Sequence, residues 1–273
     1  MPVAETATND GALVAQQVGY EQKAFWRNPA AAGFTVIFPL LFLVIFSLTS
    51  NSSTITVGHQ GGHPLKVHGI QYFAAGLLAF GLITACYTSL SINLTTRRDE
   101  GMLKRKRGTP LPAWAFITGV VGNAMIVGLF LTVVVTAFGR LAYGLNVPGS
   151  RLVTLVVVLL VGSAAFCALG ILLTCFIPNA DAAPAIANIS IFPLIFISGV
   201  FFPVDNDTLN RIADFFPVRH FIKGLNTVFG TPIGHQAPGL LHLPWKDLAV
   251  VAAWGVVGAA LAAKRFRWEP KRG

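Results

Sequence analysis

Residues 152–180 read LVTLVVVLLVGSAAFCALGILLTCFIPNA, a run without an acidic, basic or histidine side chain. About 20 apolar residues suffice for a helix to cross a lipid bilayer, so this stretch alone predicts a membrane protein. In the whole chain 54% of the residues are hydrophobic and 11% are charged, whereas soluble domains carry about 25% charged residues. Most of the surface must therefore face lipid. The net charge of +9 then indicates membrane orientation rather than nucleic-acid binding.

Other apolar runs of similar length lie on both sides of this one. The last, Leu248–Ala263, would be about 24 Å long as a helix, and its flanking Lys246 and Lys264 extend it to the two membrane interfaces. We therefore predict an all-α membrane protein, a single transmembrane domain over residues 1–273 with six spans. The expected spans are about 30–48, 70–96, 113–139, 152–180, 182–204 and 246–264.

The distribution of Lys and Arg predicts the orientation. With the N-terminus inside, 13 of these residues fall on the cytoplasmic side and 7 on the outer side. Cytoplasmic loops of membrane proteins carry the excess of Lys and Arg. Met1–Asp10 lacks the basic start and apolar core of a cleavable signal peptide. We therefore expect a multi-pass protein of the plasma membrane with both termini in the cytoplasm.

The segment Asn9–Trp26 precedes the first span. Val14, Val18 and Phe25 recur at helical spacing and lie opposite polar side chains such as Lys23. This pattern predicts an amphipathic helix lying on the cytoplasmic membrane surface.

The loop Arg97–Pro112 is strongly basic and too short for a domain. The run Arg98-Asp99-Glu100 followed by Met102 and Leu103 predicts a short helix within it, which Gly108 and Pro110 would end.

The segment Phe202–Pro244, on the outer side, is too long for a simple connection. Apolar residues recur every three or four positions over Leu209–Phe229 and are interrupted at Pro217. Two short amphipathic helices are predicted here, dipping into the outer leaflet or folding back into the bundle as a re-entrant pair between spans 5 and 6. The following Thr231–Pro244 is rich in Gly, Pro and His and is typical of a loop.

Chemistry-bearing motifs are absent from the sequence. It contains no phosphate-binding GxxxxGK[ST] loop and no zinc-ligand spacing. His59, His63 and His68 lie close together but fit no ligand pattern, and we expect them to be solvated in a flexible loop. We expect no catalytic residue, no metal site and no bound cofactor, and no ATP hydrolysis by this chain alone.

Neutral polar residues lie within the expected spans, which lack ionisable side chains in their interiors. The absence of such side chains argues against a proton antiporter, because a coupling ion must be bound near the midplane. The polar residues either hydrogen-bond between helices or contact a transported compound. Candidates for a transport pathway are Thr88, Asn123 and Asn188.

Three stretches resemble the permeases of type-2 ABC exporters, including the daunorubicin-resistance branch. They are Arg97–Leu111 (RRDEGMLKRKRGTPL), Ile197–Val204 (ISGVFFPV) and Phe215–Phe221 (FFPVRHF). The order and spacing of these stretches match those of the family over roughly Gln16–Arg267. The resemblance implies a channel of two permeases, this chain with a second copy or a related chain. It also implies a separate ABC ATPase subunit that binds ATP and Mg.

The resemblance also implies roles for individual residues, with the N-terminal helix as a second cytoplasmic contact. The loop after span 2 would be a coupling helix that docks on the ATPase, and the helices after span 5 would shape an outer gate. The expected coupling residues are Arg98, Asp99, Glu100, Met102, Leu103 and Arg105. The expected gate residues are Phe202, Pro203, Phe216, Pro217 and Phe221.

Glu100 is expected to serve energy transfer, since acidic residues contribute little to orientation. Met102 and Leu103 would be apolar side chains exposed to the cytosol until a partner covers them. The alternative is that Arg97–Arg107 is only a topological anchor.

Two other functions remain open at this point: a membrane-embedded enzyme acting on lipid, and a channel or scaffold subunit without an ATPase. The long apolar spans favour a lipophilic or amphiphilic cargo for an exporter.

Overall fold

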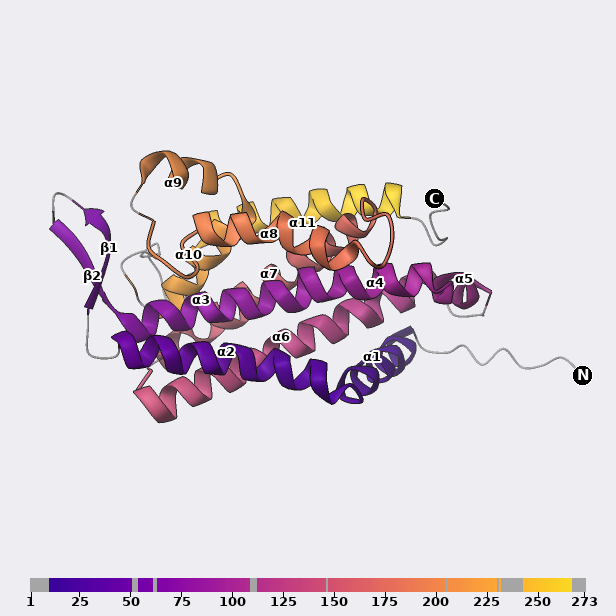
Figure 1. Cartoon of the computed structure of the whole chain (residues 1–273), viewed down its shortest axis with the longest axis horizontal. Helices are drawn as coiled ribbons and strands as arrows, with labels where there is room; N and C mark the ends of the chain where they lie inside the picture. The colour runs from indigo at the N-terminus through magenta and orange to yellow at the C-terminus, as the bar shows by residue number, and fades with distance from the viewer. Residues whose placement is uncertain are drawn as a thin grey trace, which may run out of the picture.

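The computed structural model of the chain describes residues 10–50, 54–60, 63–108, 112–145, 147–204, 206–229, 231 and 243–266. These residues form an elongated helical bundle (Figure 1). The helices are α1 (Asp10–Trp26), α2 (Pro29–Ser50), α3 (Gly69–Ile83), η1 (Thr84–Ser89, π-helical), α4 (Leu90–Asp99), α5 (Met102–Arg107), α6 (Ala113–Tyr143), η2 (Gly149–Arg151, 3-10), α7 (Leu152–Thr174), α8 (Ala183–Ile197), α9 (Asp207–Ala213), α10 (Pro217–Phe229) and α11 (Trp245–Arg265).

Four of these helical stretches are long and apolar enough to cross a membrane: 69–99, 114–143, 149–174 and 245–265. The first of them joins α3, η1 and α4 without a break. The predicted spans at 30–48 and 182–204 correspond to shorter apolar helices over 35–48 and 183–197. A multi-pass membrane protein is thus established, while the count of six spans remains a prediction.

Two predicted boundaries, those of spans 4 and 5, are wrong. The helix expected over 152–180 ends at Thr174, because Pro178 cannot continue it. The helix expected over 182–204 ends at Ile197, shortly before Gly199, whose φ of 75° is outside the helical range. Both runs are as apolar as predicted, but hydropathy does not report where the backbone turns.

A β-hairpin was not expected and corrects the all-α prediction. β1 (Thr54–Gln60) pairs antiparallel with β2 (His63–His68), with Ile55 opposite Val67. Val67 packs in a small cluster with Phe73 at the start of α3. The expected flexible histidine loop is therefore strand over these residues, and the side chains of His59 and His63 lie outside the described part of the chain.

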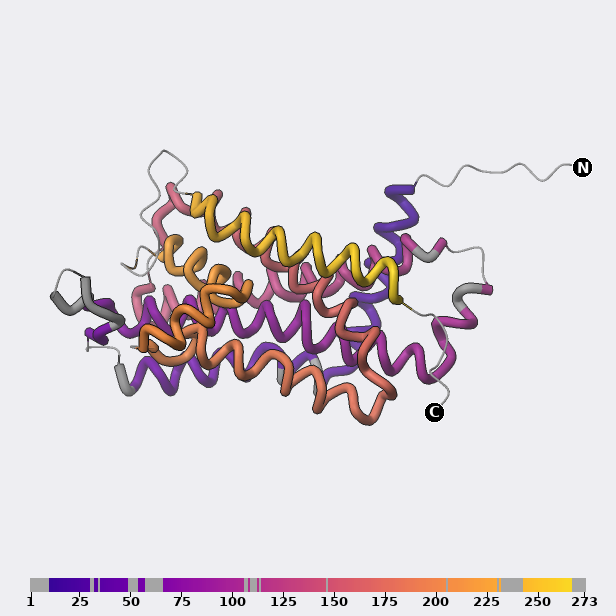
Figure 2. The backbone as a smooth tube through the Cα atoms, turned by 90° about the horizontal axis from the view of Figure 1, so that it is seen from above, coloured from indigo at the N-terminus to yellow at the C-terminus, as the bar shows by residue number. Residues whose placement is uncertain are grey.

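The hairpin and α5 lie at opposite ends of the bundle, as Figure 1 shows, and α1 and the last turn of α11 lie toward the α5 end (Figure 2). The start of α1 and the end of α11 are therefore on the same side of the bundle as the basic loop. This is the arrangement that the charge distribution predicts. Which side of the membrane it faces stays a prediction, and the basic tail beyond Phe266 lies outside the described residues.

The predicted N-terminal helix is α1, but its packing differs from the prediction. Its most buried side chains are Gln17 and Glu21, not its apolar ones. They lie against α6, where Gly119 lets α1 approach: a Cβ on Gly119 would be 2.4 Å from Cγ of Gln17. The helix is docked on α6 through these polar groups together with apolar contacts of Val18 and Trp26. The buried polar groups have partners that are described below.

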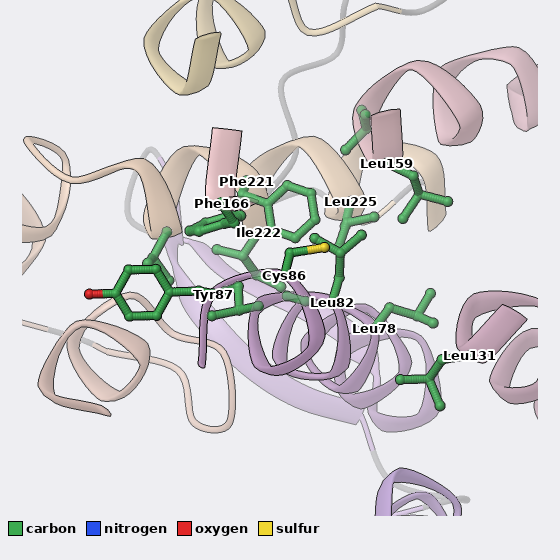
Figure 3. Close-up of a cluster of buried hydrophobic side chains, with 14 of the residues drawn as sticks. Leu78, Leu82, Cys86, Tyr87, Leu131, Leu159, Phe166, Phe221, Ile222 and Leu225 are labelled. Atoms are coloured by element: carbon green, nitrogen blue, oxygen red, sulfur yellow. The ribbon is translucent and has the colours of Figure 1, made fainter. Parts of the chain in front are cut away.

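Both predicted helices after span 5 are present. In α9 the side chain of Asn206 caps the helix by accepting a hydrogen bond from the N–H of Leu209 at 3.1 Å. The second helix, α10, starts at Pro217 and is buried along its whole described length, in contact with α3, α7 and α11. Figure 3 shows Phe221 of α10 beside Phe166 of α7. That the pair re-enters the membrane is still a prediction.

Close packing joins α11 to α7. Gly255 and Gly258 of α11 permit the close approach: a Cβ on Gly255 would lie 2.9 Å from Cα of Ala165. The neighbouring Ala259 is exposed.

We predict that Gly255→Leu destabilises the protein by about 1–3 kcal/mol or more, because the backbone of Ala165 blocks the added side chain. The matched control Ala259→Leu adds its methyl groups on the exposed face of the same helix and should be tolerated. Thermal unfolding of both purified variants in detergent measures the difference. Equal melting temperatures would contradict the tight α7–α11 contact.

Candidate functional site

The link from α4 to α5 forms a tight corner at the end of the bundle. α4 ends at Asp99, and Gly101 has a φ of 69°, a conformation that glycine adopts without strain. The N–H of Gly101 bonds to the carbonyl of Arg98, and the N–H of Arg105 bonds to that of Gly101. We call Arg97–Arg107 the α4–α5 corner. The predicted short helix is confirmed from Met102 onward as α5, whereas Arg98–Glu100, expected at its start, belong to the end of α4 and the turn after it. Thr109–Leu111, the end of the recognised motif, lie outside the described residues.

Arg98 is buried, with 3% of its surface exposed. Its Nη1 donates to the carbonyl of Thr174 at 2.9 Å, and its Nη2 donates to the carbonyls of Ile177 and Pro178 at 3.0 and 3.2 Å. The last carbonyls of a helix have no partner within the helix and carry partial negative charge. Arg98 therefore caps the end of α7 with a full positive charge.

Asp99 completes this arrangement. Its Oδ1 lies 3.3 Å from Nε of Arg98, and its Oδ2 accepts the N–H of Ala180 at 2.6 Å. Arg98 and Asp99, adjacent residues of α4, thus hold the turn between α7 and α8. We call this pair of residues the Arg98–Asp99 clamp.

Arg97 fixes the corner to α1. Its two terminal nitrogens each lie 2.7 Å from an oxygen of the Glu21 carboxylate, a bidentate pair in which the Glu21 side chain is 7% exposed. The guanidinium also lies 6.0 Å above the ring of Phe116 in α6. Sequence reasoning named neither Arg97 nor Glu21 as a site residue. The sequence feature that could have identified Glu21 is its position one helical turn after Gln17, on the same face of α1.

The corner leaves some predicted coupling residues exposed and buries others. Glu100, Met102 and Arg105 are exposed, and Nη2 of Arg105 donates to the carbonyl of Glu100 at 3.2 Å. Leu103 is 1% exposed and belongs to the main core. The expectation that Leu103 is an exposed docking residue is therefore wrong, because α5 turns this side chain back into the bundle.

The predicted outer-gate residues are not gathered in one place. Phe202 is exposed and meets the edge of Phe46 in α2, with ring centroids 6.4 Å apart. Phe216 stacks on Trp254 of α11 at 6.1 Å. These two aromatic rings thus lie against different helices.

Two further gate candidates are core residues. Phe221 is 1% exposed and packs on Phe166 at 5.4 Å, while Pro217 is buried at the first position of α10. Pro203 is half-buried and lines a small cavity with Tyr72. The structure therefore gives Phe221 and Pro217 a packing role in this conformation.

The pathway candidates are also separate. Asn123 lines a cavity of about 80 Å³ with Ser89 and Asn93, and its Oδ1 is buried without a hydrogen-bond partner among the described residues. Thr88 is buried in η1, and Asn188 is half-buried on α8. Of the three candidates, Asn123 thus lines this cavity, whose walls are partly polar and partly apolar.

A buried His–Asp pair links α10 to α11. Nδ1 of His220 lies 2.7 Å from Oδ1 of Asp247, and its Nε2 lies 2.8 Å from the carbonyl oxygen of Asp214. In a hydrolytic triad the second nitrogen would face a nucleophilic hydroxyl or thiol. Here it faces a peptide oxygen, so the pair is a structural tie and gives no support to a lipid-modifying enzyme.

The side chain of Asp214 sits between two cations at the same turn. Burial raises the pKa of this carboxyl, but Lys223 at 2.5 Å and Arg219 at 3.3 Å outweigh it, and the pKa lies below its ordinary value. The carboxylate is thus ionised at neutral pH. It balances part of the positive charge that Arg219 and Lys223 place on the first turns of α10.

The apolar helices of spanning length define a multi-pass membrane protein, and the charged corner lies at one end of its helical bundle. Residues 16–229 match the family model for the ABC-2 type transporter. The chain belongs to this family and is a transmembrane transport permease rather than a catalytic protein.

Two of the similar proteins described next are named as permeases. The chain is 25% identical over 231 residues to the inner membrane transport permease YadH of Escherichia coli (strain K12), covering 84% of this chain and 83% of that protein. It is 26% identical over 216 residues to nodulation protein J of Rhizobium leguminosarum bv. viciae, covering 74% and 78%. A shorter match, 26% over 133 residues, covers 48% of this chain and 36% of the probable multidrug ABC transporter permease YbhR of Escherichia coli (strain K12).

We predict that Arg98→Met lowers the stability of the protein by about 3–5 kcal/mol, because it leaves Asp99 and three backbone carbonyls without their partner. The matched control Arg105→Met removes an equal charge from an exposed side chain and should change stability by about 0.5 kcal/mol or less. Thermal unfolding in detergent measures both. Similar stabilities of the two variants would contradict the clamp.

Proposed function

We propose that this permease is half of an ATP-driven exporter that moves lipophilic or amphiphilic compounds out of the cytoplasm or the inner leaflet. A separate ABC ATPase subunit, which binds ATP and Mg, docks beneath it, and a second copy or a related permease completes the channel. The α4–α5 corner is the coupling helix, and α1 is the second contact. The observation that carries this proposal is the connection of the corner to α1 through Arg97, and to the end of α7 and the α7–α8 turn through Arg98 and Asp99.

The charged contacts fix the corner to the neighbouring helices, so that it is not a loose loop. Arg97 holds α1 through Glu21, and Arg98 and Asp99 hold the turn between α7 and α8. Buried, fully bonded polar groups have few alternative arrangements, so a displacement of one partner is passed on to the others. A push on the exposed side of α5 would therefore move α1, α4, α7 and α8 together.

The cargo is proposed from the character of the spans. Arg98 lies at the corner end of the bundle, whereas the interior polar groups such as Asn123 and Thr88 are neutral. One relative is named a probable multidrug permease, which is compatible with a lipophilic compound. Exposed apolar side chains on α2 and α8, such as Leu41 and Ile189, face either lipid or the second permease.

We predict that the corner faces the cytoplasm. In a background with the three cysteines replaced by alanine, Lys104→Cys should react with an impermeant thiol reagent only after the cells are permeabilised. Asp207→Cys, on the opposite side of the predicted topology, should react in intact cells. Both positions are exposed, so poor access does not explain a failure to label. Labelling of Lys104→Cys in intact cells would show the opposite orientation.

We predict that replacing Glu100 and Met102 together by alanine uncouples the ATPase from export. Both side chains are exposed at the corner, so the variant should fold and insert normally but bind the ATPase more weakly. Co-purification, ATPase rate and export by the assembled complex are the measurements.

Leu103→Ala is the control for packing. This side chain is buried, so its loss should lower the melting temperature by removing core contacts. If the double variant binds the ATPase and exports at the unchanged rate, the corner is only a topological anchor.

A further inference from the structure

A cavity of about 530 Å³ lies behind the α4–α5 corner, between the ends of α7 and α11. Arg98, Lys264 and Arg265 line it, and no carboxylate of the described residues does. The proposed coupling role uses Arg98 only through the carbonyls and the carboxylate that it contacts. The cavity and the two cations of α11 are therefore not explained by that role.

The two cations of α11 are available to a ligand. Lys264 and Arg265 are exposed, and within the described residues no carboxylate lies at ion-pair distance from either. Arg265 lies 5.9 Å above the ring of Phe176, which holds its guanidinium at the cavity wall. Three positive charges around one hollow, with Asp99 balancing only Arg98, favour an anion.

An apolar groove of about 200 Å³ starts at the same wall. Phe176 lines both the cavity and the groove. Leu172 and Leu173 of α7, Leu194 of α8 and Trp254 of α11 line the groove further on. A basic cavity thus leads at Phe176 into a groove with mostly apolar walls.

The cavity and the groove together extend over a length comparable to half of a bilayer core. Trp254, which lines the groove, and Arg265, which lines the cavity, lie 11 positions apart on α11, which corresponds to about 16 Å of helix. Half of the hydrocarbon core of a bilayer is about 15 Å thick. A phosphate in the cavity and the first part of an acyl chain in the groove therefore fit along this length.

The geometry points to a binding site for an anionic phospholipid, with its phosphate in the basic cavity and one acyl chain in the groove. Basic pockets between transmembrane helices on the cytoplasmic side suit such headgroups. The assignment of this lipid to the inner leaflet rests on the proposed orientation. The proposal that the lipid binds does not depend on that orientation. The bound phosphate lies between Lys264 and Arg265 beside the clamp, balances one of their two positive charges, and joins α11 to the corner.

The fluorescence of Trp254 provides the test, because bromine atoms quench a nearby indole. The purified full chain in detergent micelles is titrated with phosphatidylglycerol that carries a brominated acyl chain, and separately with the matching phosphatidylcholine. Phosphatidylglycerol should bind about tenfold more tightly, since two cations favour its net charge. Trp254→Phe identifies the quenched signal, and that signal should disappear in this variant.

Two double variants test whether the cations of α11 select the lipid. Lys264→Gln with Arg265→Gln should lose the preference for phosphatidylglycerol. The matched control, Arg140→Gln with Lys246→Gln, removes the same charge from exposed positions elsewhere and should keep that preference. Equal binding of the two lipids by the unaltered protein would overturn the proposal.

Quenching that persists unchanged in Trp254→Phe would also overturn it. So would displacement by excess inorganic phosphate as effective as that by unbrominated phosphatidylglycerol, because the ligand would then be free phosphate. None of these measurements depends on the orientation or on the ATPase, so a failure here is distinct from a failure of the proposed exporter function.

Discussion

A single buried guanidinium organises one end of this protein. Arg98 donates to the carbonyls of Thr174, Ile177 and Pro178, where α7 ends and no further turn of helix satisfies those oxygens. Burying a charge at 3% exposure is costly unless it is paired and hydrogen-bonded. Here the helix end and Asp99 supply that compensation. Arg98 thus holds the start of the α7–α8 turn and also forms part of the wall of the basic cavity.

The adjacent Arg97 extends the same constraint to α1. Because consecutive residues of a helix point in different directions, Arg97 reaches Glu21 on one side while Arg98 reaches α7 on the other. The corner is therefore held from two sides, and the buried Leu103 adds an apolar contact from α5 itself. Among the described side chains of the corner, Glu100, Lys104 and Arg105 are exposed together with the apolar Met102. A small docking surface on a rigid support follows from this arrangement.

Hydropathy predicts the helices well because lipid offers no hydrogen-bond partners. A single segment that crosses lipid must therefore satisfy its own backbone groups, which a helix does. The N-terminal helix, the short α5 and the two helices around Pro217 were also predictable, since each has a regular apolar spacing or a clear breaker. The β-hairpin was missed because Thr54–His68 contains glycine and histidine, which indicate loop, among its β-branched residues. The burial of Leu103 was missed for a different reason. A helix of six residues has too few positions for its apolar side to be recognised.

The basic residues of the corner show why the candidate site was only partly predictable. A cation that merely orients a protein remains solvated, so sequence reasoning treats Arg97, Arg98 and Arg105 alike. In the structure Arg98 is buried against backbone, Arg97 is mostly buried against a carboxylate, and Arg105 is exposed. Their partners, Thr174 and Glu21, lie 76 positions away along the chain, beyond any local pattern. Burial therefore divides one positive cluster into residues that hold the bundle together and residues that are free to meet a partner.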